Sequence, residues 1–163
     1  MGETVRCPAT GTLTDMSADL SARVQAVDHV GLAVFDLDEA IDFHCRTFGL
    51  VVTHREDNVE QGVSEAMLAP PGCSAEGAAV QLLAPLRPDS PIGAFLERSG
   101  PGLQQLAYRV DDVETAAAAL RQAGVRMLYE RSRRGTAGSL INFAHPKDTG
   151  GVLVELVQPP ASR

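Results

Sequence analysis

The chain repeats itself, and this internal repeat limits the folds open to its 163 residues more than any other feature. When the sequence is shifted by 76 positions, residues 29–40 lie over residues 105–116, and apolar residues fall mostly on apolar residues. A shift of 74 positions places residues 81–85 over residues 155–159, a difference that one loop length explains. Self-similarity at a fixed spacing indicates a duplicated structural module.

Each copy has the pattern of one strand, one helix and three further strands. In the first copy, a β-rich run at 27–34 comes before apolar residues at helical spacing from Leu37 to Phe48, and strand-like runs follow at 50–55, 63–69 and 78–84. In the second copy, the helix lies between Val113 and Gly124, and the strands are predicted at 103–110, 126–129, 139–144 and 152–157. The pattern predicts an α+β fold of two βαβββ modules that form a curved mixed sheet around one cavity.

The predicted organisation is a single domain, because 163 residues is about one domain's length. We expect residues 1–25 to form a flexible leader, since few large apolar side chains occur there. The domain then spans 26–160, with modules at 26–85 and 102–159. The connector at 86–101 carries a short predicted helix that starts at residue 90 or 91 and ends at 98.

Charge and hydropathy exclude several classes of protein. The formal net charge is −7, from 14 Lys and Arg against 21 Asp and Glu, whereas a general nucleic-acid binder needs a basic surplus. No apolar run approaches the ~20 residues that cross a bilayer, and no basic and apolar targeting segment opens the chain. We therefore expect a cytoplasmic protein with neither nucleic acid nor a membrane as its partner.

Polar residues interrupt the apolar strands at only two positions of the module. His29 and Gln105 are equivalent residues in the first strands of the two copies, and Gln81 and Glu155 are equivalent residues in the last strands. A single Gln or Glu in a strand usually faces solvent, and a single His is usually structural. The repeat weakens these simpler interpretations, because all four residues occupy only two positions of the module. Burying a polar group without a partner is also costly, so such residues in buried strands need partners. We expect the four side chains to converge in one pocket.

The ordered motifs of the chain resemble the vicinal oxygen chelate superfamily, with the glyoxalase and bleomycin-resistance fold, and within it the methylmalonyl-CoA epimerases. The resemblance runs from about residue 27 to residue 158. It rests on six segments: 27–33 (VDHVGLA), 60–63 (EQGV), 81–86 (QLLAPL), 89–92 (DSPI), 141–147 (INFAHPK) and 149–156 (TGGVLVEL). It implies a glyoxalase-like fold and a homodimer.

The resemblance also implies a divalent metal held by two His, a Gln and a Glu, which would correspond to His29, Gln81, Gln105 and Glu155. One position departs from the pattern, because Gln104 and Gln105 stand where the family has a pair of His residues. An amide oxygen is a weaker and harder ligand than an imidazole nitrogen. We therefore expect lower metal affinity, for Co or for Mn, Mg, Zn or Ni, or a metal-free site whose amides bond to substrate.

The implied reaction is epimerisation of a 2-substituted malonyl-CoA or acyl-CoA thioester. It removes a proton from the carbon beside two carbonyls and returns it on the other face, which needs two proton-handling groups. The resemblance assigns these roles to Glu65 and Glu155. Three arginines in an acidic chain cluster at 131–134, and we expect Arg134, Gly135 and Lys147 to bind coenzyme A phosphates, the alternative being a solvated loop.

Two other functions compete with the epimerase. The substitution at Gln105 suits a related isomerase or cyclase of a natural-product intermediate, with a reshaped and metal-free pocket. The same fold also suits a binding or resistance protein without turnover. Two retained carboxylates at Glu65 and Glu155 count against a pure binder, because burying them is costly unless they are paired or protonated.

Overall fold

Two copies of one strand, helix and three-strand unit follow each other in the computed structural model, which describes residues 24–72 and 77–161. The first copy contains β1 (Val24–Ala33), α1 (Leu37–Phe48), β2 (Val51–Asn58), β3 (Val63–Ala69) and β4 (Ala79–Pro85). After the connecting helix α2 (Pro91–Ser99), the second copy contains β5 (Gly102–Val110), α3 (Val113–Gln122), β6 (Arg133–Arg134), the 3-10 turn η1 (Thr136–Gly138), β7 (Leu140–Ala144), the 3-10 turn η2 (Pro146–Asp148) and β8 (Leu153–Gln158).

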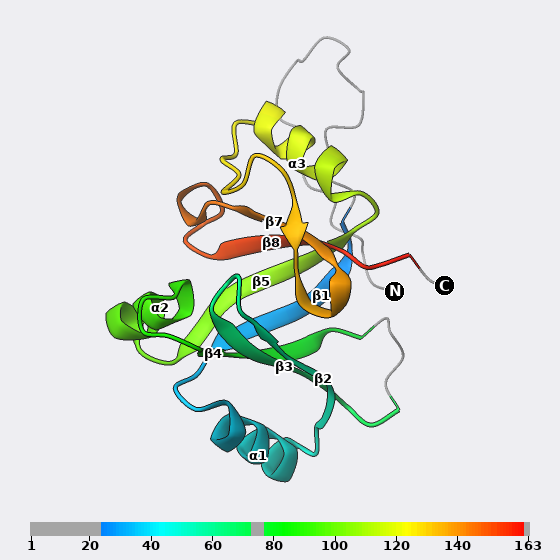
Figure 1. The fold of residues 1–163 in the computed structure, drawn as a ribbon. Helices are drawn as coiled ribbons and strands as arrows, with labels where there is room; N and C mark the ends of the chain where they lie inside the picture. Colours follow the sequence, from blue (N-terminus) through cyan, green and yellow to red (C-terminus); the bar gives the residue numbers. More distant parts are fainter. Residues whose placement is uncertain (1–23, 73–76, 162–163) are drawn as a thin grey trace, which may run out of the picture.

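All eight strands belong to one mixed sheet in the order β2-β3-β4-β1-β5-β8-β7-β6. The two copies meet where β1 pairs antiparallel with β5, and each of these strands also pairs in parallel with the last strand of its own copy, β4 or β8. The sheet curls, and α1 and α3 lie outside its two halves (Figure 1). The predicted α+β, glyoxalase-like architecture is confirmed.

The two helices outside the sheet begin in the same way because the repeat preserves their capping residues. Asp36 accepts a hydrogen bond from the backbone N–H of Glu39 at the start of α1, and Asp112 accepts one from Thr115 at the start of α3. An aspartate at this position satisfies one of the N–H groups that a helix leaves unpaired. Gly49 follows α1 with a φ of 68°, a left-handed conformation that suits glycine and ends the helix.

Apolar faces join the helices to the sheet. Leu37 of α1 packs in one cluster with Leu68 and Leu82, and Val113 of α3 packs in another with Val110 and Leu156. The side chains that face the opposite, concave side include Ala33, which shares a cluster with residues of β3, β4 and α2. Alternation along β1 therefore separates a packing face from a cavity face, as expected for a strand.

One predicted strand is wrong. Residues 126–129 form only an isolated bridge between Met127 and Ala144, and the strand β6 instead lies at Arg133–Arg134, where it pairs with Ile141 and Leu140. The turn η1 explains the shift, because it folds the chain back so that the residues before it pair with β7. The β-prone composition of 126–129 could not reveal that this segment makes only one bridge to β7, while the residues just before η1 form the paired strand.

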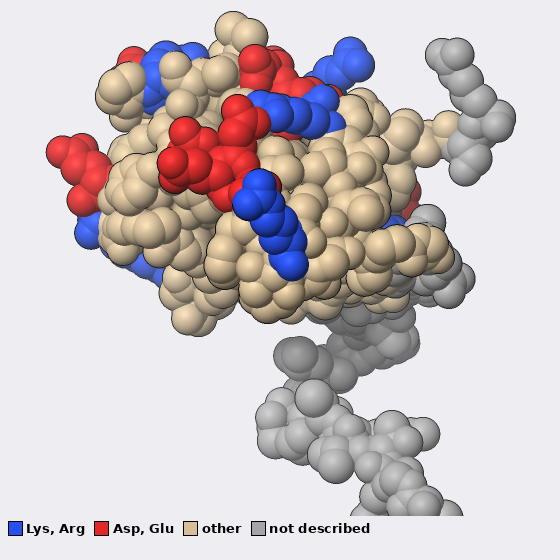
Figure 2. All heavy atoms as spheres, turned by 90° about the horizontal axis from the view of Figure 1, so that it is seen from below, with Lys and Arg blue, Asp and Glu red and all other residues tan. Residues whose placement is uncertain are grey.

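The ends of the predicted domain lie close to the observed elements. β1 begins at Val24, inside the segment predicted as a leader, and the rest of that leader lies outside the described residues. Within 24–72 and 77–161, no helix is long and apolar enough to cross a membrane. The face turned toward the viewer in Figure 2 shows acidic and basic side chains close together. Within and beside α1, the structure has the ion pairs Arg46–Asp42 and Arg55–Asp38.

Candidate active site

The four polar exceptions to the strand pattern meet on the concave face of the sheet. They come from the four central strands, His29 from β1, Gln81 from β4, Gln105 from β5 and Glu155 from β8. Strand register brings them together: Gly31 pairs with both Gln81 and Gln105, and Ala107 pairs with both His29 and Glu155. All four are buried, with exposed fractions between 2% and 6%.

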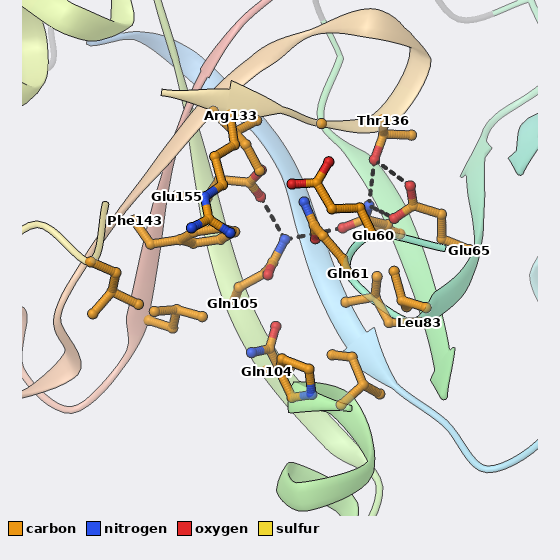
Figure 3. Close-up of a pocket in the computed structure, with 18 of the residues that line it drawn as sticks. Glu60, Gln61, Glu65, Leu83, Gln104, Gln105, Arg133, Thr136, Phe143 and Glu155 are labelled. Carbon is orange, nitrogen blue, oxygen red and sulfur yellow. Dashed lines mark hydrogen bonds between the residues drawn. The ribbon is translucent and has the colours of Figure 1, made fainter. Parts of the chain in front are cut away.

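A continuous chain of hydrogen bonds crosses this group (Figure 3). The Gln81 amide donates to Glu65 Oε2 over 2.9 Å, and its own Oε1 accepts from Gln105 Nε2 over 3.1 Å. The same Gln105 nitrogen donates to Glu155 Oε2 over 2.5 Å. Glu65, from β3, therefore joins the four residues, and the two carboxylates predicted to move protons are linked across both modules.

A cavity of about 330 Å³ opens beside this row of hydrogen-bonded side chains. Its polar side contains Glu65, Gln81, Gln105 and Glu155, and its apolar side includes Leu83, Ile92, Leu128, Phe143 and Leu153. His29 instead lines a neighbouring cavity of about 250 Å³, and Thr136 and Glu155 line both. The larger cavity offers a small reactant one apolar wall and the two buried carboxylates Glu65 and Glu155, with a third carboxylate, Glu60, also in its lining.

Glu65 is poised to exchange a proton near neutral pH. Burial and the nearby carboxylates Glu56 and Glu155 raise the pKa of Glu65 to about 7, although a hydrogen bond from the Thr136 hydroxyl opposes the shift. A carboxyl group with a pKa near the working pH serves well as a general acid or base, because both forms are populated.

His29 lies between two carboxylates. Its Nδ1 is 3.0 Å from Asp28 Oδ1, and its Nε2 is 3.1 Å from Glu155 Oε2. Burial alone would lower the pKa of His29, but the hydrogen bonds and charges of Asp28 and Glu155 outweigh it and raise the value to about 9. Arg109 donates to Asp28 over 2.8 Å and completes the network. Through its ring, His29 orients Glu155.

Thr136 and Gln104 are among the pocket residues that the sequence did not identify as part of the site. Thr136 donates to Glu65 Oε1 and accepts from Gln81 Nε2, although it belongs to η1 in the other module. Gln104 lines the cavity because of a β-bulge between β1 and β5. Gly31 pairs with Gln105 and the next residue, Leu32, pairs with Leu103, so Gln104 is the extra residue on β5. Bulges re-aim side chains in this way. No periodic signal marks either residue, since both depend on irregular backbone.

Comparisons with known proteins identify the family of this chain. Residues 28–143 match the family described as the Glyoxalase/Bleomycin resistance protein/Dioxygenase superfamily. The chain belongs to this superfamily. The epimerase relatives reported below confirm the expected enzyme class, an isomerase of the epimerase type.

Three similar proteins are methylmalonyl-CoA epimerases. The crystal structure of the one from Mycobacterium tuberculosis is 54% identical, with a TM-score of 0.80, and the match covers 86% of this chain and 91% of that one. A structure of a methylmalonyl-CoA epimerase with methylmalonyl-CoA and NH4+ is 46% identical, covering 85% and 96%, also with a TM-score of 0.80. An ethylmalonyl-CoA/methylmalonyl-CoA epimerase from Cereibacter sphaeroides is 35% identical over 134 residues, covering 81% and 96%.

The superfamily resemblance implied a divalent metal, and the donor set of this chain does not fit one. No cluster of three or more His, Cys, Asp or Glu side chains suited to a metal occurs among the described residues. Gln105 turns its –NH2 group, and not its carbonyl oxygen, toward Glu155 and Gln81. An amide N–H is a hydrogen-bond donor and offers no electron pair to a cation. We therefore assign no step of the reaction to a metal ion.

The residues predicted to bind phosphate lie at the edge of the site. Gly135 lines the cavity, and a Cβ there would lie 2.5 Å from Ile141 Cγ2, so glycine lets β6 approach β7. Arg134 is exposed, and its backbone oxygen accepts from Gln61 Nε2 over 3.4 Å. Lys147 is exposed on η2 and is not part of the cavity wall. The basic group inside the cavity wall next to them is Arg133, stacked 3.9 Å above the Tyr129 ring.

Proposed function

We propose that this chain epimerises methylmalonyl-CoA or a closely related 2-substituted malonyl-CoA thioester. The observation that carries the proposal is the pair of buried carboxylates, Glu65 and Glu155, in the wall of one cavity and joined by hydrogen bonds through Gln81 and Gln105. Inversion at carbon 2 requires one group to remove a proton and another to return it on the opposite face. Two bases from different modules suit that requirement.

In the proposed reaction, each glutamate serves one epimer as base and the other as acid. Among the described residues, Glu155 accepts side-chain hydrogen bonds from His29 and Gln105, both at Oε2, and in the proposal its Oε1 takes the substrate proton. Glu65, with its pKa near 7, holds or releases a proton at neutral pH. Positioned acid and base groups of this kind accelerate proton transfer by about 10²–10⁴-fold.

Other groups in the cavity suit the rest of such a substrate. The Arg133 guanidinium can pair with the malonyl carboxylate, and its charge would also stabilise the enolate that forms when the proton leaves. Gln104 Oε1 is buried without a hydrogen-bond partner among the described residues, and it can accept from an amide N–H of the pantetheine arm. Arg134, Gly135 and Lys147 are proposed to meet the phosphates of coenzyme A.

The test of the proposed function is exchange and inversion in deuterated water. We expect each epimer of methylmalonyl-CoA to gain deuterium at carbon 2 and to convert to the other, followed by mass spectrometry and by chromatography of the two epimers. Ethylmalonyl-CoA serves as the second substrate. If a folded preparation exchanges neither thioester, the epimerase proposal is overturned, and the natural-product isomerase becomes the better hypothesis.

A binding or resistance protein without turnover is less well supported. Its pocket would gain nothing from two buried carboxylates, whose desolvation costs free energy without contributing to the retention of a neutral drug. Assembly as a homodimer, which the resemblance predicts, is checked by light scattering on the full chain.

A further inference from the structure

Gln105 places a hydrogen-bond donor where the other groups of the predicted metal site converge. Its Nε2 lies 2.5 Å from Glu155 Oε2, 3.1 Å from Gln81 Oε1 and 3.4 Å from His29 Nε2. These are the three side chains that would share a cation with Gln105. The Gln105 side-chain nitrogen therefore lies where the side chains of Glu155, Gln81 and His29 meet, and its N–H groups donate hydrogen bonds to Glu155 and Gln81.

The opposite orientation of the Gln105 amide is disfavoured by its neighbours. It would place the carbonyl oxygen of Gln105 against a carboxylate oxygen of Glu155 and against Gln81 Oε1. Among the described residues, these three acceptors would then share a single donor, His29 Nε2, which lies 3.4 Å from the Gln105 position and is already bonded to Glu155 over 3.1 Å. Gln81 cannot relieve this by turning over, because its own –NH2 donates to Glu65 Oε2 and to Thr136 Oγ1. Turning Gln81 would break both bonds, and an unsatisfied buried polar group costs about 1–3 kcal/mol.

The other side chains around the Gln105 amide are also held in place by their neighbours. Both ring nitrogens of His29 face carboxylates, Nδ1 toward Asp28 and Nε2 toward Glu155. Gly31 leaves the space in which Gln105 lies, since a Cβ at Gly31 would be 2.5 Å from Gln105 Cγ. The strands and the hydrogen-bond chain thus hold the Gln105 amide in one place and one direction.

We propose that the Gln105 amide takes the place of the divalent cation implied by the superfamily, so that this pocket is complete without a metal. This inference rests on the proposed epimerase function for its catalytic consequence, which is turnover that does not depend on a divalent ion. In the proposed site, Gln105 and His29 together hold Glu155, and Gln81 and Thr136 hold Glu65.

The experiment measures metal binding and turnover separately on the full chain. We expect the purified wild-type protein to contain no stoichiometric divalent metal by elemental analysis, and added Co²⁺ to produce no absorption band of bound cobalt. After treatment with a chelator, epimerisation should stay within about twofold of the untreated rate, whereas an epimerase that needs a divalent ion would lose turnover when the ion is removed.

A substitution at Gln105 that supplies a metal ligand should make the protein bind a divalent metal, and Gln105→His should make its turnover depend on that metal. Gln105→His supplies an imidazole nitrogen, and we expect it to bind Co²⁺ at least about tenfold more tightly than the wild type and to lose turnover on chelation. Gln105→Glu, which keeps the shape and removes the donor, should bind Mn²⁺ more tightly than the wild type. Gln104→His is the matched control: it adds the same group one residue away and should acquire no cobalt band.

The outcomes distinguish the two proposals. A wild-type chain that holds a stoichiometric divalent ion, or that loses turnover on chelation and regains it with metal, would overturn the role of Gln105. Equal cobalt binding by the Gln104→His and Gln105→His variants would overturn it as well. Cobalt binding is read without any substrate, so a chain that fails to epimerise would contradict the proposed function while the metal question is still answered.

Discussion

Glu65 and Glu155 are the two ends of one hydrogen-bond chain that runs through Gln81 and Gln105 and crosses the boundary between the two modules. Each link has a fixed direction, because each amide donates with its nitrogen and accepts with its oxygen. The two carboxylates therefore keep a defined orientation toward the cavity, although they are 90 positions apart in the sequence.

Removing one glutamate should stop inversion but leave exchange on one face. In Glu65→Gln, the base that remains is Glu155, so one epimer should still gain solvent deuterium at carbon 2 while the rate of epimerisation falls by about 10²–10⁴-fold. Glu155→Gln should exchange the other epimer instead. The measurement is mass spectrometry of each pure epimer after incubation in deuterated water. Equal exchange of both epimers by either variant would contradict the assignment of one base to each face.

The Thr136 hydroxyl should set the pH at which Glu65 works. Its hydrogen bond lowers the pKa of Glu65, so Thr136→Val should raise that pKa above the present value of about 7. In the direction of reaction where Glu65 is the base, the rise of kcat/KM with pH should then move to higher pH. Thr136→Ser keeps the hydroxyl and is the control. A profile that is the same for Val and wild type would exclude this role.

Glu65 should make the fold less stable as the pH rises. Its pKa is about 7 in the folded protein and near the ordinary 4.5 when unfolded, so between these values the folded state binds more protons. The free energy of unfolding therefore falls through this window, by about 3 kcal/mol in total. The Glu65→Gln variant lacks this titrating group. Between about pH 4 and pH 8, its free energy of unfolding, measured with denaturant, should therefore rise by about 3 kcal/mol relative to that of the wild type. A pH-independent difference would refute the shift.

Gly31→Ala should destabilise the protein through Gln105. The added Cβ would lie 2.5 Å from Gln105 Cγ, and overpacking of this kind costs about 1–3 kcal/mol. In a Gln105→Ala background the cost should be smaller, because the crowded atom is gone. A double-mutant cycle of unfolding free energies measures the difference. If the cost is unchanged, the crowding comes from Leu83 Cδ1, which would be 3.2 Å away.

The phosphate-binding prediction is tested with a truncated substrate. Arg134→Ala and Lys147→Ala should each raise KM for the coenzyme A thioester about tenfold and leave kcat unchanged, as expected for the loss of one charge-assisted hydrogen bond. With methylmalonyl-pantetheine, which lacks the nucleotide phosphates, the same variants should behave like the wild type. An equal rise in KM for both substrates would point to a structural effect instead.

Part of the site followed from the sequence because strands alternate and because the module is duplicated. A polar residue in a buried strand needs a partner, and His29, Gln81, Gln105 and Glu155 occupy equivalent positions of two copies that pair through β1 and β5. Their meeting was predictable for that reason. Glu65 was found only through the resemblance, since a single Glu in a strand is usually solvated.

The sequence by itself determined the two modules and the convergence of four polar side chains, because periodicity and the repeat can be read from the local pattern of residue types. Only the tertiary structure decided which way the Gln105 amide points, that Thr136 reaches Glu65 from the other module, and that a bulge brings Gln104 into the cavity. Those features depend on contacts between segments distant in the chain and on irregular backbone. A linear pattern of residue types does not encode them.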